Sequence, residues 1–125
     1  MEKIRIALIG AGETGTPLLR TLLAQEFVEL VGIADLDSAM PGILLAQQNG
    51  VTTTNNFMDF LALGDQVDIL IDVTGAPKVR EQLRSALQER NNKHTIIMHE
   101  MIAVLLMSMA QGKLVSIKHN HLNYS

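Results

Sequence analysis

The sequence predicts a doubly wound α/β fold, in which helices cover both faces of a parallel β-sheet to give three layers. Short runs rich in Val and Ile alternate with longer segments of helical periodicity, and a glycine-rich loop follows the first of these runs. Strands buried on both faces need nearly continuous apolar runs, as these segments have. The length of 125 residues suits one domain, so we expect residues 1–125 to form a single domain, complete or cut from a longer chain.

In the first half of the chain, β-branched runs define the strands and apolar residues at three- and four-residue spacing define the helices. Pro17 suits a first helical turn, where its missing N–H has no partner. Pro41 and Gly42 predict a turn before the second helix, and Gly50 predicts its end. The expected strands are 4–9, 29–34 and 51–53, and the expected helices are 16–25, 43–49 and a short one over 57–63 that Asn55 or Asn56 caps.

The second half repeats the alternation. The strongest later strand is 67–73, and a loop through Pro77 leads from it into a helix over 78–89. We then expect a strand over 95–98, a helix over 100–110 that ends before Gly112, and one further strand over 114–117.

Composition excludes several classes of function. The chain has no cysteine, which removes thiolate chemistry and cysteine zinc sites. A net charge of −3 and 3% aromatic residues argue against a nucleic-acid interface. The first residues lack the pattern of a signal peptide, and the longest apolar run falls short of the roughly 20 residues that cross a bilayer. We therefore expect a cytoplasmic protein with neither nucleic-acid nor membrane partners.

The most informative motif is G-x-G-x-x-G, formed by Gly10, Gly12 and Gly15 between a predicted strand and a predicted helix. In this motif the first glycine permits the tight turn, the second lets a pyrophosphate approach the backbone, and the third lets the helix pack closely on the strand. The anion then lies at the positive end of the helix. A plain glycine-rich turn without a ligand remains the alternative.

Asp35 supplies the second half of a dinucleotide fingerprint. It ends the second predicted strand and follows Gly15 by 20 residues, where an acidic residue binds the ribose hydroxyls of the adenosine moiety. Its charge repels a 2′-phosphate, which favours NAD over NADP. The alternative is an aspartate that only forms a turn.

Four further residues complete the candidate binding site. Glu13 suits the helix dipole but competes with a phosphate for it, and either points outward or weakens binding. Thr14 either donates a hydrogen bond to a phosphate or is an ordinary first-turn residue. Thr74 and Gly75 follow the strand 67–73, so we expect them in the crevice at the carboxyl ends of the strands, with a simple turn as the alternative.

No residue type in the sequence points to catalysis. His94 and His99 flank a predicted strand, and His119 and His121 lie in a polar tail without a third metal ligand nearby. No nucleophile elbow or paired-carboxylate pattern is present. We therefore assign no catalytic residue and no metal site.

The segment from Met101 to Ala110 is apolar nearly all the way round the predicted helix. Such a helix is buried on more than one side. We expect its partner to be a second subunit or a further domain, and a core helix of this domain is the alternative.

The segments 6–15 (IALIGAGETG), 30–35 (LVGIAD) and 67–77 (VDILIDVTGAP) resemble the Rossmann coenzyme-binding domain of the dihydrodipicolinate reductase, homoserine dehydrogenase and aspartate dehydrogenase superfamily. A Pro-Gly turn at 41–42 and the Val-Thr-Gly-x-Pro pattern at 73–77 also resemble Rossmann modules at the N-terminus of bacterial sensory-box histidine kinases. These resemblances imply that Gly10, Gly12, Gly15 and Asp35 contact a dinucleotide. They also imply that substrate-binding groups belong to a second domain.

Three functions follow from this reading. The first is a non-catalytic module that binds NAD(H), or another nucleotide such as coenzyme A, and senses redox state for a signalling protein. The alternative is the coenzyme-binding half of an NAD(P)-dependent oxidoreductase whose substrate domain is missing. A degenerate scaffold that binds nothing, suggested by Glu13, is the third.

Overall fold

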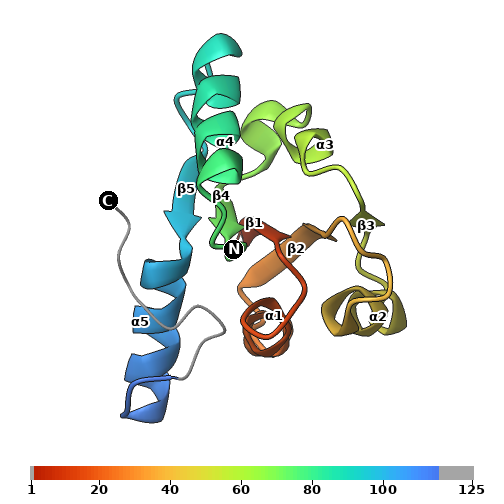
Figure 1. Cartoon of the computed structure of the whole chain (residues 1–125), viewed down its shortest axis with the longest axis vertical. Coiled ribbons are helices and arrows are strands. Elements are labelled where there is room, and N and C mark those ends of the chain that lie inside the picture. Colours follow the sequence, from red (N-terminus) through yellow and green to blue (C-terminus); the bar gives the residue numbers. More distant parts are fainter. Residues whose placement is uncertain (1, 116–125) are drawn as a thin grey trace.

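The computed structural model describes residues 2–115 of the chain. A five-stranded parallel sheet runs through it in the order β3-β2-β1-β4-β5 (Figure 1). The strands are β1 (Ile4–Ile9), β2 (Val28–Ala34), β3 (Thr53–Thr54), β4 (Ile69–Asp72) and β5 (Ile96–His99). The helices are α1 (Gly15–Leu23), α2 (Pro41–Gln48), α3 (Met58–Leu61), α4 (Pro77–Glu89) and α5 (Glu100–Gln111), with a 3₁₀ turn η1 at Gly64–Gln66.

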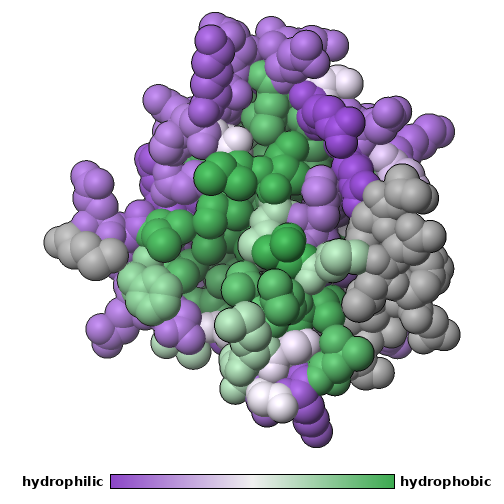
Figure 2. All heavy atoms as spheres, turned by 90° about the vertical axis from the view of Figure 1, so that its left-hand side faces the viewer, coloured by the Kyte–Doolittle hydropathy of each residue, from purple (hydrophilic) through white to green (hydrophobic). Residues whose placement is uncertain are grey.

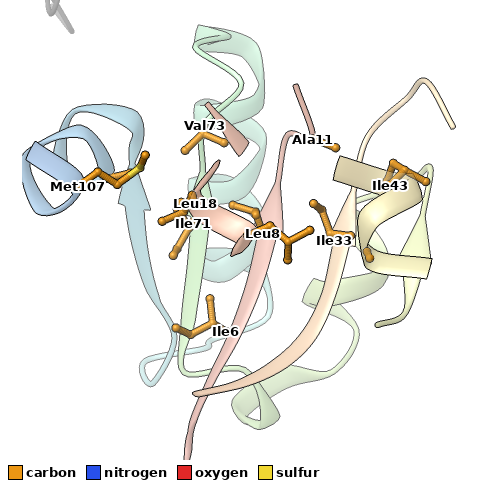
Figure 3. Close-up of a cluster of buried hydrophobic side chains, with 12 residues drawn as sticks. Ile6, Leu8, Ala11, Leu18, Ile33, Ile43, Ile71, Val73 and Met107 are labelled. Carbon is orange, nitrogen blue, oxygen red and sulfur yellow. The ribbon is translucent and has the colours of Figure 1, made fainter. Parts of the chain in front are cut away.

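Two apolar cores, one on each face of the sheet, confirm the predicted three-layer arrangement. On one face, α1, α2 and α5 pack through residues such as Leu18, Ile43 and Met107 against Leu8 and Ile71 (Figure 3). The other face is covered by α3 and α4, whose buried residues include Phe60, Leu61, Leu83 and Ala86. Because both faces are buried, the central strands are apolar at successive positions, which is why they were readable in the sequence.

The structure corrects several predicted boundaries. Helix α2 begins at Pro41 rather than Ile43, because proline suits the first helical position and Gly42 packs directly on the backbone of Ala11. Strand β3 is Thr53–Thr54, since only these two residues pair with β2. Strand β4 begins two residues later than predicted, because Val67 and Asp68 lie between η1 and the sheet.

The predicted last strand, 114–117, is not found in its described part. Leu114 and Val115 have no strand pairing, and Val115 donates its N–H to the hydroxyl of Ser108 at 2.9 Å. Ile117, His119 and His121 lie outside the described residues. Gly112 ends α5 with φ of 73°, as predicted for a C-terminal glycine cap.

The carboxyl ends of the central strands lie level with one another. Ile9 of β1 pairs with Ala34 of β2 on one side and with Asp72 of β4 on the other, and Asp72 in turn pairs with His99 of β5. The loops that follow these residues therefore share one edge of the sheet. The order of strands reverses between β1 and β4, which marks the ligand crevice of an open α/β sheet.

Candidate dinucleotide-binding site

The glycine loop between β1 and α1 has the geometry that the motif predicts. Gly10 has φ of +110°, a conformation that residues with a side chain rarely adopt. A Cβ on Gly15 would lie 1.9 Å from the carbonyl oxygen of Gly10, so only glycine permits this close packing. A Cβ on Gly12 would meet only the flexible end of Met40, at 3.2 Å. The glycine at position 12 is therefore not required by the packing of the chain itself, which agrees with a role in ligand approach.

Thr14 lies at the N-cap position of α1 and is 6% exposed. Its hydroxyl is buried and has no hydrogen-bond partner among the described residues. A buried polar group without a partner is costly, so such groups in folded proteins generally have a reason for their placement. Thr14 lines the cleft described below. Its hydroxyl and the N–H groups of the first turn of α1 are thus available to a ligand with anionic oxygens.

Asp35 joins the end of β2 to the glycine loop. One carboxylate oxygen accepts a hydrogen bond from the backbone N–H of Ala11 at 2.9 Å, and the other accepts from Asp37 at 3.0 Å. The residue remains partly exposed. Each carboxylate oxygen has two acceptor sites, so Asp35 retains capacity for the hydroxyls of a ligand.

A cleft of about 270 Å³ lies above these residues. Its floor is the glycine loop and the ends of the strands, and its walls are mostly apolar. Glu13 and Asp35 are its charged lining residues. Ala76, in the loop after β4, also lines the cleft, together with residues that the sequence did not assign to a binding site: Leu36, Met40, Asn55, Phe57 and Val79. They come from three separate loops and helices, so only the folded chain brings them together.

The structure places most of the predicted site residues in this cleft. Gly10, Gly12, Glu13, Thr14, Gly15, Asp35 and Thr74 all line it. Gly75 does not, and is exposed with φ of 67°. Glu13 precedes the helix and is exposed at the rim of the cleft.

Asp72 is 3% exposed and holds the loop after β4. One carboxylate oxygen accepts hydrogen bonds from the backbone N–H and the hydroxyl of Thr74, at 3.0 and 2.6 Å. The other lies 3.3 Å from Nδ1 of His99. Burial lowers the pKa of His99 below its ordinary value of 6.5, and nearby Arg80 and Arg84 lower it further, while Asp72 opposes them.

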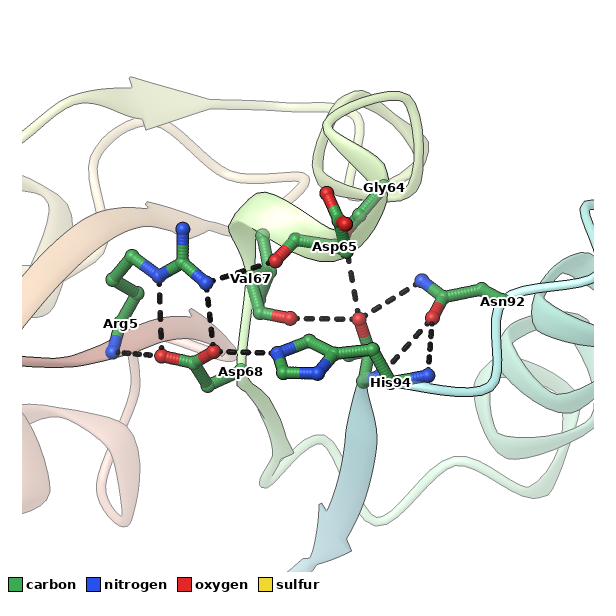
Figure 4. Close-up of polar contacts among 8 residues, drawn as sticks. Arg5, Gly64, Asp65, Val67, Asp68, Asn92 and His94 are labelled. Carbon is green, nitrogen blue, oxygen red and sulfur yellow. Dashed lines mark hydrogen bonds and ion pairs between the residues drawn. The ribbon is translucent and has the colours of Figure 1, made fainter.

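The second histidine beside β5 lies at the opposite, amino edge of the sheet. Nε2 of His94 is 2.6 Å from Asp68, which also accepts from the side chain and backbone N–H of Arg5 (Figure 4). These hydrogen bonds, led by that from the Arg5 side chain, hold the pKa of Asp68 far below its usual value. This cluster ties β1, β4 and the start of β5 together, away from the cleft.

Residues 2–115 hold no group of three or more His, Asp or Glu side chains able to bind a metal ion. Within the same range, no helix has the length and apolar character needed to span a membrane.

Comparison with known proteins places this geometry in a family. The chain matches the family model described as the NAD-binding domain of homoserine dehydrogenase over residues 10–111. It is 38% identical over 79 residues to acetaldehyde dehydrogenase 1 of Burkholderia cenocepacia. The aligned region covers 61% of this chain and 26% of the relative. It is 29% identical over 116 residues to acetaldehyde dehydrogenase of Chloroflexus aurantiacus, and this alignment covers 92% of this chain and 35% of the relative.

Solved structures show the same fold. A homoserine dehydrogenase of S. aureus superposes with a TM-score of 0.61 and 24% identity, over 91% of this chain and 32% of that one. GenD2 from gentamicin A biosynthesis, determined in complex with NAD, gives a TM-score of 0.57 and 23% identity. The match covers 79% of this chain and 34% of GenD2. The chain therefore spans about a third or less of these relatives. The glycine loop, the acidic end of β2 and the match over residues 10–111 show that this chain belongs to the family of homoserine dehydrogenase NAD-binding domains, with NAD as its cofactor.

Proposed function

We propose that this chain is the coenzyme-binding half of an NAD-dependent oxidoreductase. The observation that carries the proposal is the buried, unpartnered hydroxyl of Thr14 beside the glycine loop and at the N-terminus of α1. The Thr14 hydroxyl and the first N–H groups of α1 supply hydrogen-bond donors, and the glycine loop supplies a backbone clear of side chains. A diphosphate would bind where these two features meet.

The remaining parts of the dinucleotide have fitting residues on either side. Asp35 takes the hydroxyls of the adenine ribose, and its carboxylate disfavours the 2′-phosphate of NADP. The apolar side chains of Leu36, Met40 and Phe57 supply a surface for the adenine ring. Leu36 is 88% exposed, which leaves it much apolar area to bury on a ligand.

The coenzyme, when bound, supplies hydride transfer. This chain's residues bind and orient it and cover one of its sides. Thr14 and Asp35 of the cleft are assigned to the coenzyme, and we propose that the substrate-binding groups belong to a further domain. Three of the four relatives named above are dehydrogenases by name, and none of the four supports the signalling role that the sensory-box resemblance implied. A cytoplasmic location stays a prediction.

The exposed face of α5 is the proposed contact with that domain or with a second subunit. Met101, Ile102, Leu105, Leu106 and Met109 are between 36% and 69% exposed and lie along one side of the helix. With Ile96 of the edge strand β5, 64% exposed, they belong to the apolar face seen in Figure 2. Exposed apolar patches of this kind mark interaction surfaces.

Calorimetric titration of the chain with NAD⁺, NADH, NADP⁺ and coenzyme A tests the proposed function. We expect NAD⁺ and NADH to bind, NADP⁺ to bind more weakly, and coenzyme A to release no heat. Absence of binding by every dinucleotide would overturn the proposal. Tighter binding of NADP⁺ than of NAD⁺ would refute the role given to Asp35.

A further inference from the structure

The carboxyl ends of β4 and β5 carry an acid–imidazole pair, with a buried carboxylate and a partly exposed imidazole, that nucleotide binding alone does not need. Asp72 is almost fully buried, and His99, whose side chain is 26% exposed, approaches it to 3.3 Å through Nδ1. An ionised carboxylate only accepts hydrogen bonds, so Nδ1 carries the proton in this pair and Nε2 is the atom that gains or loses one. The pair is fixed in place because Asp72 also accepts two hydrogen bonds from Thr74.

The fold places this pair at the carboxyl ends of β4 and β5, where Asp72 holds Thr74, a residue that lines the cleft; Asp72 and His99 are not themselves among the lining residues. A doubly wound sheet binds one mononucleotide on each side of the point where strand order reverses, here between β1 and β4. Asp35 directly follows β2 and would hold the adenosine half on that side. The ends of β4 and β5, beyond Thr74, which lines the cleft, would then hold the nicotinamide half. This step rests on the function proposed above.

The two redox states of the nicotinamide differ in charge: the ring of NAD⁺ carries a positive charge and that of NADH is neutral. A positive charge near an imidazole disfavours its protonated form. We propose that the Asp72–His99 pair couples protonation of this domain to the redox state of the bound coenzyme, with His99 releasing its proton from Nε2 to solvent more readily beside NAD⁺ than beside NADH.

The groups around His99 set the range in which this coupling acts. Asp72 of β4 favours the protonated imidazole, and Arg80 and Arg84 of α4 favour the neutral one. Glu100, 1% exposed, follows His99 directly at the start of α5. Burial is the largest influence and lowers the pKa of His99 below 6.5, so the imidazole of the free protein titrates on the acid side of neutrality.

Nuclear magnetic resonance titration of the histidine side chains tests this proposal without any enzymatic assay. Spectra of the whole chain would be recorded against pH without ligand, with NAD⁺ and with NADH, and His99→Gln and His94→Gln would assign the two signals. We expect the pKa of His99 to be lower with NAD⁺ than with NADH by about one unit, a tenfold difference in proton affinity. The signal of His94, which lies at the amino ends of the strands, should be the same in both complexes at every pH.

Linkage gives a second readout in the binding constants themselves. The preference for NAD⁺ over NADH should rise by up to about tenfold as pH rises through the titration of His99. His99→Gln should abolish this pH dependence, and His94→Gln should retain it. If both coenzymes bind and the pKa of His99 is the same with each, the coupling is overturned while the proposed function stands. If neither coenzyme binds, both fail.

Discussion

The carboxylate of Asp35, at the end of β2, accepts a hydrogen bond from the backbone N–H of Ala11 in the glycine loop at 2.9 Å. The residue that the dinucleotide fingerprint assigns to ribose binding thus also holds the loop assigned to the diphosphate. The two halves of the fingerprint are separated in sequence by more than twenty residues, and one side chain connects them. A change at Asp35 should therefore affect both parts of the proposed site.

Replacing Asp35 with Asn should weaken NAD⁺ binding by about 10- to 100-fold, the value of losing hydrogen bonds to a charged group. The amide keeps one oxygen for Ala11 but loses the charge and one acceptor atom. Binding of NADP⁺ should fall less, because the repulsion of its 2′-phosphate is removed. Calorimetry measures both affinities. Asp37→Asn, an exposed neighbour, is the control, and equal effects of the two variants would contradict the assignment.

Replacing Gly12 with Ala should impair ligand binding without impairing folding, whereas replacing Gly15 with Ala should impair folding. In Gly12→Ala, the new methyl group meets only the movable end of Met40, so we expect a melting temperature within a few degrees of wild type and loss of NAD⁺ binding. In Gly15→Ala, the methyl group clashes with the backbone of Gly10, and unfolding should become easier by about 1–3 kcal/mol or more. Normal NAD⁺ affinity in folded Gly12→Ala would argue against a diphosphate at this loop.

Thr14→Val removes the unpartnered hydroxyl while keeping the shape of the side chain. Because no hydrogen bond within the described chain is lost, we expect thermal stability to be unchanged or raised. Affinity for NAD⁺ should fall by about tenfold, the value of one hydrogen bond of about 1.4 kcal/mol. Thr14→Ser should keep most of the affinity. Thr21→Val, which changes an exposed hydroxyl on the same helix, should bind NAD⁺ normally.

Asp68→Asn should lower the melting temperature at neutral pH, because Arg5 and His94 both lose a charged partner. The pKa of Asp68 is lowered in the folded state, so the unfolded chain takes up its proton first as the solution is acidified. The stabilisation is complete above the unfolded value of 3.8 and declines as pH falls below it. The difference in melting temperature between wild type and variant should therefore narrow from pH 5 to about pH 3. Asp65→Asn serves as the control, since Arg5 donates a hydrogen bond to the backbone oxygen of Asp65, which the substitution retains, and the Asp65 carboxylate acts on Arg5 only through a weaker charge interaction.

Charged substitutions on the exposed face of α5 should leave the stability of the isolated domain unchanged but should prevent its assembly with a partner. Leu105 and Leu106 are each 51% exposed, so Leu105→Lys with Leu106→Lys should leave the melting temperature of the monomer nearly unchanged. Sedimentation at high concentration should show a dimer for wild type and a monomer for this variant if the partner is a second subunit. Leu44→Lys, 49% exposed on α2, should behave as wild type. A wild-type monomer would instead favour a further domain as the partner.

The order of elements and the place of the main candidate binding residues were predictable because each depends on local sequence. Glycine at positions 10, 12 and 15 and a carboxylate at the end of a strand belong to one motif with fixed spacing. Asp35 was predicted to lie where the second strand ends. The pairing of Ala34, the last residue of β2, with Ile9, the last residue of β1, confirms this position. Helix starts were less predictable, as at Pro41, because a proline–glycine pair reads equally as a turn and as a first helical turn.

The sequence alone determined that both faces of the sheet are covered and that a glycine loop precedes α1, because both features depend on the order of nearby residues, through apolar periodicity and glycine spacing. It did not determine which distant residues meet. Only the tertiary structure showed that the Thr14 hydroxyl is buried without a partner, that Asp35 contacts Ala11, and that Asp72 lies beside His99. The reason is physical: parallel pairing sets residues 27 positions apart at the same level of neighbouring strands, and that register depends on how the whole sheet packs.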